Sequence, residues 1–204
     1  MIYWINGPYG VGKSTVAEAL QKMLPKAHIY DAEEVGNAIR DNFPEESKYS
    51  IIFEGYSLWR ETNYKLLKEI YEKYDGDIIV PMTLIMPESY EEIIKRLMDL
   101  DVKVKYVILD ADYLTVHDRI IARGEKENCW CMQNIDMCLD ALQSDRHAVH
   151  IDTREKSPEQ IAKRMEKSIF MGLRKVTRLM QLRLVIKSAF APGMKAIGKT
   201  TIGL

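Results

Sequence analysis

The chain has 204 residues, 47% of them hydrophobic, which suits a globular protein with a sizeable core. Residues after Met171 contain seven Lys or Arg and no Asp or Glu, so the net charge of −1 leaves residues 1–171 at −8. This acidic main part argues against broad nucleic-acid binding. No apolar run reaches the length of a membrane span.

The N-terminal segment carries the clearest motif. Residues 2–6 are apolar and β-branched, which predicts a buried strand, and residues 15–24 predict a helix. Between them, residues 7–14 fit G-x-x-x-x-G-K-[ST] at every fixed position. Glycines let backbone N–H groups turn toward phosphate oxygens, and the helix start adds its positive end. Strand, loop and helix therefore predict a phosphate-binding loop rather than a simple turn.

This loop implies ATP and Mg²⁺ as cofactors. Lys13 is expected to reach the β- and γ-phosphates, and the Ser14 hydroxyl is expected to ligate Mg²⁺. Motor NTPases close a long apolar strand with an acidic residue, but here the strand at residues 78–80 ends in Pro81, and Asp110 ends a strand but opens a helix. The nucleotide-binding residues expected here are Gly7, Pro8, Tyr9, Gly10, Val11, Gly12, Lys13, Ser14 and Thr15.

Strands and helices alternate along the rest of the chain. Ser57 and Ser157 are expected to be N-caps of two of the helices. The alternation predicts an α/β P-loop NTPase fold, a five-stranded parallel sheet sandwiched by helices, with ligands at the carboxyl ends of the strands. The further strands are predicted at residues 27–30, 78–80, 102–109 and 148–151, and the helices at 32–40, 58–74, 88–100, 111–123, 129–143 and 158–170.

The layout resembles that of nucleoside-monophosphate and shikimate kinases, in which a helix with spaced arginines leads into a lid. Arg119 and Arg123 are four residues apart, and residues 124–131 form a polar break suited to a lid. In the kinase interpretation both arginines neutralise the transferring phosphoryl group. The alternative is that they pair with solvent or with Glu125 and Glu127.

A closer resemblance covers residues 1–165. The chain resembles the tunicamycin-resistance ATP-binding protein family, which implies ATP binding and a kinase-like fold, with antibiotic resistance attributed to one member. The segments that carry it are Trp4-Ile5-Asn6-Gly7, Tyr30-Asp31, Val35-Gly36, Ala38-Ile39-Arg40, Tyr56-Ser57-Leu58-Trp59-Arg60, Asn63-Tyr64, Val80-Pro81-Met82-Thr83, Asn128-Cys129-Trp130 and Gln133-Asn134-Ile135-Asp136.

Resembling small-molecule kinases place an acidic residue at the end of the second strand, facing the acceptor hydroxyl. That position is Asp31 here, which we expect to be a catalytic base or substrate anchor. N-capping of the next helix is the alternative role for Asp31. Glu33 is expected either to hold Mg²⁺ through water or to remain solvated at the helix start.

Further substrate-side predictions concern cations and aromatic faces. Arg40 and Arg60 are expected to bind the substrate, and Trp59 to give it a stacking face, with core packing as the alternative. Thr83 is expected to hydrogen-bond an acceptor or only to turn the chain. Arg154, after the last strand, is expected to cover the adenine or to remain exposed.

We expect a P-loop kinase-like domain at residues 1–170 and a basic helix and tail at 171–204. The tail is expected to pack on its own core or a partner chain, with an anionic membrane surface as the main alternative. The odd set Cys129, Cys131 and Cys138 favours free thiols in a cytoplasmic protein, with contact to the inner membrane face left open. The oligomeric state is left open by the sequence.

The predicted function is an ATP-dependent phosphotransferase that acts on a small hydroxyl-bearing molecule, such as a nucleoside, a sugar or an antibiotic like tunicamycin. Two alternatives remain open. One is an ATPase switch that acts through a partner. The other is a resistance protein that sequesters a drug without chemistry.

Overall fold

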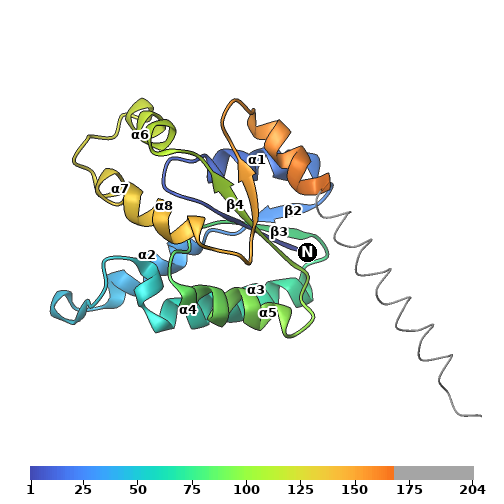
Figure 1. The fold of residues 1–204 in the computed structure, drawn as a ribbon. Helices are drawn as coiled ribbons and strands as arrows, with labels where there is room; N and C mark the ends of the chain where they lie inside the picture. The colour runs from blue at the N-terminus through green and yellow to red at the C-terminus, as the bar shows by residue number, and fades with distance from the viewer. Residues whose placement is uncertain (168–204) are drawn as a thin grey trace, which may run out of the picture. The chain divides into compact units, whose positions relative to one another are not determined.

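A single parallel sheet organises the chain. The computed structural model describes residues 1–167, of which Met1–Met165 form one compact unit. Neighbouring strands are all parallel and lie in the order β2-β3-β1-β4-β5 (Figure 1). The predicted five-stranded parallel sheet is therefore confirmed. The strands are β1 (Ile2–Asn6), β2 (Ala27–Ile29), β3 (Asp77–Pro81), β4 (Val104–Asp110) and β5 (Val149–Asp152).

Helices connect the strands in the predicted alternation. Residues 158–167 are also helical. The helices are α1 (Lys13–Met23), α2 (Ala32–Asn42), α3 (Ser57–Lys73), α4 (Pro87–Ser89), α5 (Arg96–Met98), α6 (Tyr113–Ala122), α7 (Trp130–Gln133) and α8 (Ile135–Gln143), with 3-10 turns η1 (Glu45–Ser47) and η2 (Phe53–Gly55) and the π-helical segment η3 (Tyr90–Lys95).

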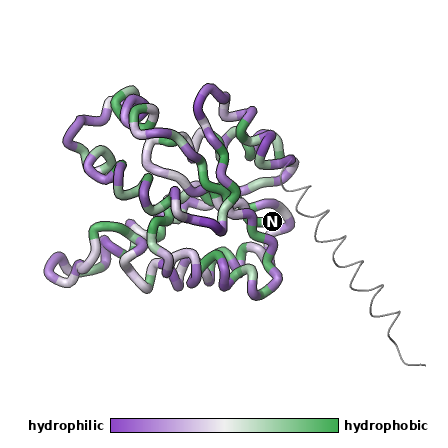
Figure 2. The backbone as a smooth tube through the Cα atoms, viewed as in Figure 1, coloured by the Kyte–Doolittle hydropathy of each residue, from purple (hydrophilic) through white to green (hydrophobic). Residues whose placement is uncertain are grey.

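The sheet is covered on both faces. α3, η3 and α5 lie against one face, while α1 and the helix at residues 158–165 lie on the other (Figure 1). Side chains alternate between the two faces of a strand, so Ile2 and Trp4 of β1 face the α3 side. The hydrophobic segments accordingly concentrate in the central strands (Figure 2).

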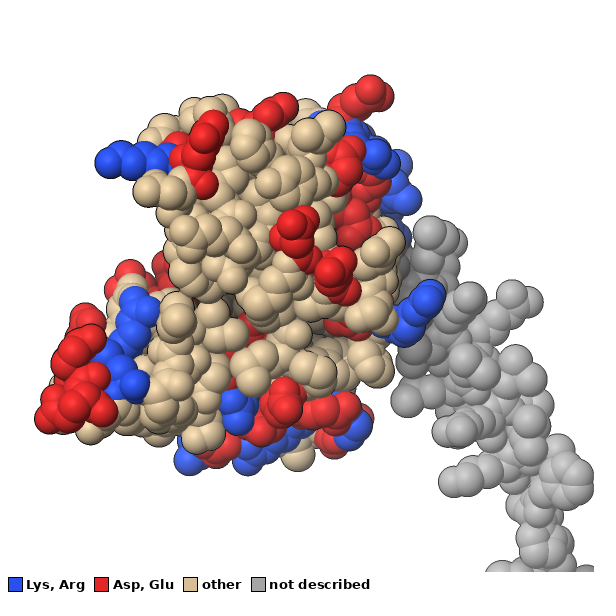
Figure 3. All heavy atoms as spheres, turned by 60° about the vertical axis from the view of Figure 1, so that its left-hand side comes forward, with Lys and Arg blue, Asp and Glu red and all other residues tan. Residues whose placement is uncertain are grey.

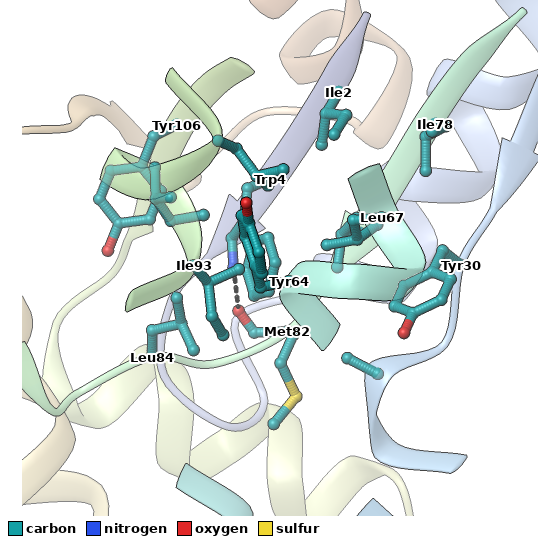
Figure 4. Packing of buried hydrophobic residues seen from close by; sticks show 14 of the residues in the cluster. Ile2, Trp4, Tyr30, Tyr64, Leu67, Ile78, Met82, Leu84, Ile93 and Tyr106 are labelled. Atoms are coloured by element: carbon teal, nitrogen blue, oxygen red, sulfur yellow. Dashed lines mark hydrogen bonds between the residues drawn. The ribbon is translucent and has the colours of Figure 1, made fainter. Parts of the chain in front are cut away.

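The core on the α3 side contains two tryptophans whose polar atoms are satisfied. Trp4 is fully buried, and its Nε1 donates to the Met82 carbonyl over 3.0 Å (Figure 4). Trp59 is also fully buried, and its Nε1 donates to the Ala32 carbonyl over 2.9 Å. The first bond ties the start of the loop after β3 to the core, and the second ties the start of α2 to it.

Two helix predictions are wrong in detail. Ser57 is not an N-cap, because the Tyr56 carbonyl already accepts from the backbone N–H groups of Trp59 and Arg60, so Ser57 is the first helical residue. The helix predicted at residues 129–143 is two helices. They part at Asn134, whose φ of −117° and ψ of 12° leave the helical region and whose Nδ2 donates to the Trp130 carbonyl.

Parallel strands bring their carboxyl ends to one edge of the sheet. The loops after β1, β2, β3, β4 and β5 therefore meet there, as predicted. Within residues 1–167, no helix is long and apolar enough to cross a membrane. The basic tail predicted at residues 171–204 lies outside the described residues.

Candidate active site

The phosphate loop joins β1 to α1 and depends on three glycines with positive φ. Gly7, Gly10 and Gly12 have φ of 148°, 85° and 105°. A Cβ on Gly10 would lie 2.6 Å from Ile120 Cγ1 and 3.1 Å from the Val116 carbonyl, so Gly10 lets α6 pack directly on the loop. A Cβ on Gly12 would meet nothing within 4 Å. The loop is thus tight on the α6 side and open at Gly12, where α1 begins.

Lys13 is the buried cation of this loop. Its Nζ donates to the carbonyls of Gly7 and Pro8 over 3.0 and 3.1 Å. Burial lowers the pKa of Lys13 to about 8. Ser14 and Thr15 are exposed in the first turn of α1, where the helix dipole favours anions. An ammonium, a free hydroxyl and an open helix start fit a nucleotide phosphate with a divalent cation.

Asn6 anchors the loop, although the sequence analysis did not single it out. Its Oδ1 accepts from the backbone N–H groups of Gly7 and Leu84 over 2.7 and 2.8 Å. Its Nδ2 donates to the Leu84 carbonyl and to the Tyr106 hydroxyl. The signal in the sequence that could have indicated this role is a polar residue at the end of an apolar strand, immediately before the loop. The loop is therefore fixed to the end of β3 through one side chain.

A cavity of about 320 Å³ lies beside Gly10 and Gly12, between α6 and the loop after β5. Arg119 lines it, and its Nη1 donates to the Val11 carbonyl and to Thr153 Oγ1 over 3.0 and 2.9 Å. Arg119 thus joins the phosphate loop to the β5 loop. Arg123 lines the same cavity and is exposed. Both predicted arginines meet here, but Arg119 is held by the protein's own oxygens.

Arg154, predicted either to cover the adenine or to remain exposed, is exposed and does not line this cavity. Its guanidinium is held by the Asp152 carboxylate over two bonds of 3.0 Å and by Asp112 over 3.2 Å. It lines a separate cavity with Pro8. The residues after β5 that line the cavity beside Gly12 are Thr153, Lys156, Pro158 and Ile161.

A second cavity, of about 390 Å³, lies on the opposite side of the loop. Tyr9 and Trp130 line it, in an edge-on contact with ring centroids 5.0 Å apart. Arg40, which is predicted to bind the substrate, also lines it, with its guanidinium 4.7 Å from the centroid of the Phe53 ring. Because Trp130 begins α7, the segment predicted as a lid contributes a wall to this cavity.

The two acidic residues at the start of α2 differ in role. Asp31 caps the helix, with Oδ1 accepting from the backbone N–H groups of Glu33 and Glu34 over 2.9 and 3.4 Å. Glu33 lines the second cavity. The residue is exposed as a whole, but protein groups around its carboxylate displace water and raise the pKa of Glu33. The negative charge of Asp31 raises this pKa further, and the positive charge of Lys13 lowers it.

Three substrate-side predictions change in the structure. The buried Trp59 presents no stacking face, because it packs in the core. The Arg60 side chain is 11% exposed and pairs with Glu92 over 2.8 Å, so it is not a free cation at the cavity. Thr83 does line the cavity, but its Oγ1 donates to the Gly7 carbonyl over 2.9 Å. Trp59 and Arg60 therefore lie outside the cavity, whereas Thr83 lines it with its hydroxyl bonded to the phosphate loop.

Glu54 is a buried acid that the sequence analysis missed. It lines the second cavity and is 3% exposed. Its carboxylate accepts from the backbone N–H groups of Ile85 and Met86 over 2.9 to 3.1 Å. Burial raises its pKa, and these bonds oppose the rise. Glu54 thus holds the loop after β3 beside the cavity. Its position within the polar connection before α3 gave no signal of burial.

On the face shown in Figure 3, Lys and Arg side chains lie among Asp and Glu side chains rather than in one continuous patch. Of the described residues on this face, the charged ones therefore do not by themselves mark a binding site.

Comparison with known proteins agrees with this geometry. The sequence model of the AAA domain family matches residues 2–143. The Deinococcus radiodurans tunicamycin resistance protein superposes with a TM-score of 0.68 at 23% identity, over 82% of this chain and 94% of that protein. The predicted resemblance is confirmed. No match was found among curated proteins.

Small-molecule kinases share the fold. A Sinorhizobium meliloti gluconokinase gives a TM-score of 0.56 at 14% identity, over 89% of this chain and 95% of that one. A Mycobacterium tuberculosis APS kinase, solved with AMPPNP and APS, gives 0.55 at 15% identity, over 81% and 95%. The chain therefore belongs to the AAA domain family and has the P-loop kinase-like fold of these proteins.

Proposed function

We propose that the protein transfers the γ-phosphoryl group of ATP to a hydroxyl of a small molecule, in the class of nucleosides, sugars or antibiotics such as tunicamycin. One observation carries the proposal. The phosphate loop contributes to three cavities, and two of them lie on opposite sides of it, one lined by Gly10 and Gly12 and the other by Tyr9. A donor and an acceptor that bind on either side of the loop would meet at Lys13.

On the donor side, the cavity beside Arg119 would receive the nucleoside, and the glycine loop would receive the phosphates. Lys13 would exchange its bonds to the Gly7 and Pro8 carbonyls for bonds to phosphate oxygens. The exposed Ser14 hydroxyl would hold Mg²⁺, which supplies charge neutralisation on the phosphates when bound.

On the acceptor side, Asp31 is the proposed base. Both of its capping bonds go to Oδ1, which leaves Oδ2 to take the proton of the acceptor hydroxyl. The acceptor oxygen then bonds to the γ-phosphorus, and the bond from that phosphorus to the oxygen of ADP breaks. Glu33, Arg40 and Trp130 would orient the acceptor, since they line its cavity.

The related folds support an acceptor that bears a hydroxyl group. They include a sugar kinase from Janibacter, with a TM-score of 0.58 at 17% identity, the gluconokinase and the APS kinase. The chain covers at least 90% of each of these proteins, so the shared fold extends over nearly their whole length.

The test is incubation with ATP, Mg²⁺ and a panel of nucleosides, aminosugars and antibiotics that includes tunicamycin. Mass spectrometry is expected to find one class of compound carrying a phosphate group. A panel in which no compound gains phosphate, although ATP binds, would overturn the proposal. ATP hydrolysis only with a partner protein would instead identify a switch, and drug binding without any mass change would identify a sequestering protein.

A further inference from the structure

A fourth cavity, of about 250 Å³, lies behind the loop that follows β3, between η3 and the end of α8. It shares no lining residue with the cavities beside Gly12 and Tyr9, and it shares only Leu142 with the cavity at Pro8. Leu84, Met86 and Leu142 give it an apolar wall. Its volume is below the range of about 300 to 1,000 Å³ that drug-sized ligands occupy, so its occupant is no larger than one or two rings.

Aromatic rings form one side of this cavity. Tyr90 and His147 are stacked, with centroids 4.2 Å apart and an interplanar angle of 18°. The Tyr106 ring lies 5.4 Å from the Tyr90 ring. Tyr90 begins the π-helical segment η3, and π-helical segments occur frequently at functional sites. Parallel rings at a cavity wall suit a planar ligand.

A fixed carboxylate lies beside the rings. Asp145 Oδ2 accepts from the Tyr106 hydroxyl over 2.9 Å, and Oδ1 accepts from the His147 backbone N–H over 2.8 Å. A carboxylate has about four acceptor positions, so each oxygen can take one more donor. Glu91 adds a second carboxylate to the lining and Arg146 adds a single cation. The cavity therefore favours a ligand that donates N–H groups and carries positive charge.

We propose that this cavity is a second ligand site, for a small planar cation with two adjacent N–H donors of the guanidine or amidine type. The ring stacks on the Tyr90 and His147 pair, and the two N–H groups donate in parallel to the Asp145 carboxylate, as guanidinium and carboxylate groups pair in proteins.

The site is joined to the phosphate loop by a short chain of hydrogen bonds. Tyr106, which donates to Asp145, accepts from Asn6 Nδ2 over 2.7 Å. Asn6 Oδ1 in turn accepts from the backbone N–H of Gly7. A ligand that competes for Asp145 acts on Tyr106 and Asn6, so we expect its binding to change the affinity of the loop for nucleotide.

The probes are 2-aminobenzimidazole, which carries the N–H pair, and benzimidazole, which has a similar ring without the amine. Each is titrated by calorimetry into the full chain saturated with Mg²⁺ and AMPPNP, which keeps the probes out of the nucleotide cavity. 2-Aminobenzimidazole is expected to bind at least about tenfold more tightly, as a hydrogen bond to a charged group implies. Equal binding of the two probes, or no binding of either, would overturn the proposal.

Variants locate the binding. Asp145→Asn is expected to abolish the preference for the probe with the amine. His147→Ala is expected to lower the affinity for both probes. His147 is exposed, so its loss leaves the core intact. The matched control is His117→Ala, because His117 also stacks on a tyrosine, Tyr113, but lies outside the cavity. Probe binding that is unchanged in Asp145→Asn and His147→Ala, or equally weakened in His117→Ala, would contradict the site.

The coupling between this cavity and the phosphate loop is measured through the effect of the probe on nucleotide binding. AMPPNP affinity is determined with and without saturating 2-aminobenzimidazole, in the wild type and in His147→Ala. We expect a shift of at least about twofold in the wild type and none in the variant. A shift of the same size in both would show that the probe acts elsewhere. These readouts use binding alone, so they stand apart from any test of phosphoryl transfer.

Discussion

The two cavities beside the phosphate loop are built in different ways. The donor side combines the glycine backbone at Gly10 and Gly12 with the start of α1, with α6 and with the segment after β5, which Arg119 joins to the phosphate loop. The acceptor side consists of side chains from the phosphate loop, α2, the connection before α3, the end of β3 and α7. Backbone geometry suits a ligand shared by many proteins, whereas assembled side chains suit a ligand particular to this one.

This difference predicts how substitutions will divide. Changes at Lys13 should affect transfer most, because Lys13 belongs to the phosphate loop between the two sides and would bind the transferred phosphoryl group. Substitutions in one cavity should change the KM for one substrate and leave the KM for the other unchanged. The expected effects below run from the largest to the smallest.

Lys13→Ala should lower the rate of phosphoryl transfer by about a thousandfold, because it removes the buried cation that would stabilise charge on the transferring group. The rate is measured under saturating ATP with the acceptor identified by the panel. Lys22→Ala, in the last turn of the same helix, is the control and should retain the wild-type rate. Normal turnover of Lys13→Ala would show that the phosphate loop does not take part in phosphoryl transfer.

Asp31→Asn should lower turnover by about a hundredfold, since an amide cannot take the proton of the acceptor hydroxyl. Asparagine is as good an N-cap as aspartate, so stability should remain within about 0.5 kcal/mol, measured by urea unfolding. Asp112→Asn is the matched control, because Asp112 caps α6 in the same manner. Normal turnover of Asp31→Asn would leave this residue with only its capping role.

Trp130→Ala should raise the KM for the acceptor by about tenfold and leave the KM for ATP unchanged, because Trp130 lines only the acceptor cavity. The reciprocal variant is Arg119→Leu, which should raise the KM for ATP and leave the KM for the acceptor unchanged. Initial rates with each substrate varied in turn separate the two. Parallel rises in both constants in both variants would contradict the division into two sides.

The smallest effect is one of pH. Burial lowers the pKa of Lys13 to about 8 from 10.5, so the free folded protein loses this proton above pH 8 while phosphate favours the charged form. Nucleotide affinity should therefore fall as the pH rises above 8, by at most about tenfold per unit. The unfolded chain keeps its proton up to about 10.5, so the free protein gains stability over the same interval.

Titration of a fluorescent ATP analogue at several pH values between 7 and 10 measures this dependence. Lys13→Arg is the control, because arginine stays charged throughout and should give a flat profile over the same interval. A wild-type profile as flat as that of Lys13→Arg would show that Lys13 is not the titrating group.

The same difference explains what the sequence could predict. The sheet and the loop follow from short local patterns, such as the apolar run at Ile2–Asn6 and the glycines after it. The acceptor side depends on partners far along the chain. Arg60 pairs with Glu92, and Trp59 bonds to Ala32. Helical spacing shows that such residues share a face, but not whether that face meets the core or the cavity.

Glu54 and Asn6 are residues of the site that the sequence did not reveal. Neither belongs to a phosphate-loop motif, and each is buried because it satisfies backbone groups more than thirty residues away, Glu54 at Ile85 and Asn6 at Leu84. A buried polar side chain with a distant backbone partner leaves no periodic signal in a sequence.

The central claim is that the phosphate loop separates a nucleoside cavity from an acceptor cavity. A crystal structure with Mg²⁺ and AMPPNP tests it most directly. We predict that the base lies in the cavity lined by Arg119 and Thr153, and that the terminal phosphate contacts Lys13 and faces the cavity lined by Glu33 and Trp130. A base in the Glu33 cavity, or a terminal phosphate directed away from it, would contradict the account.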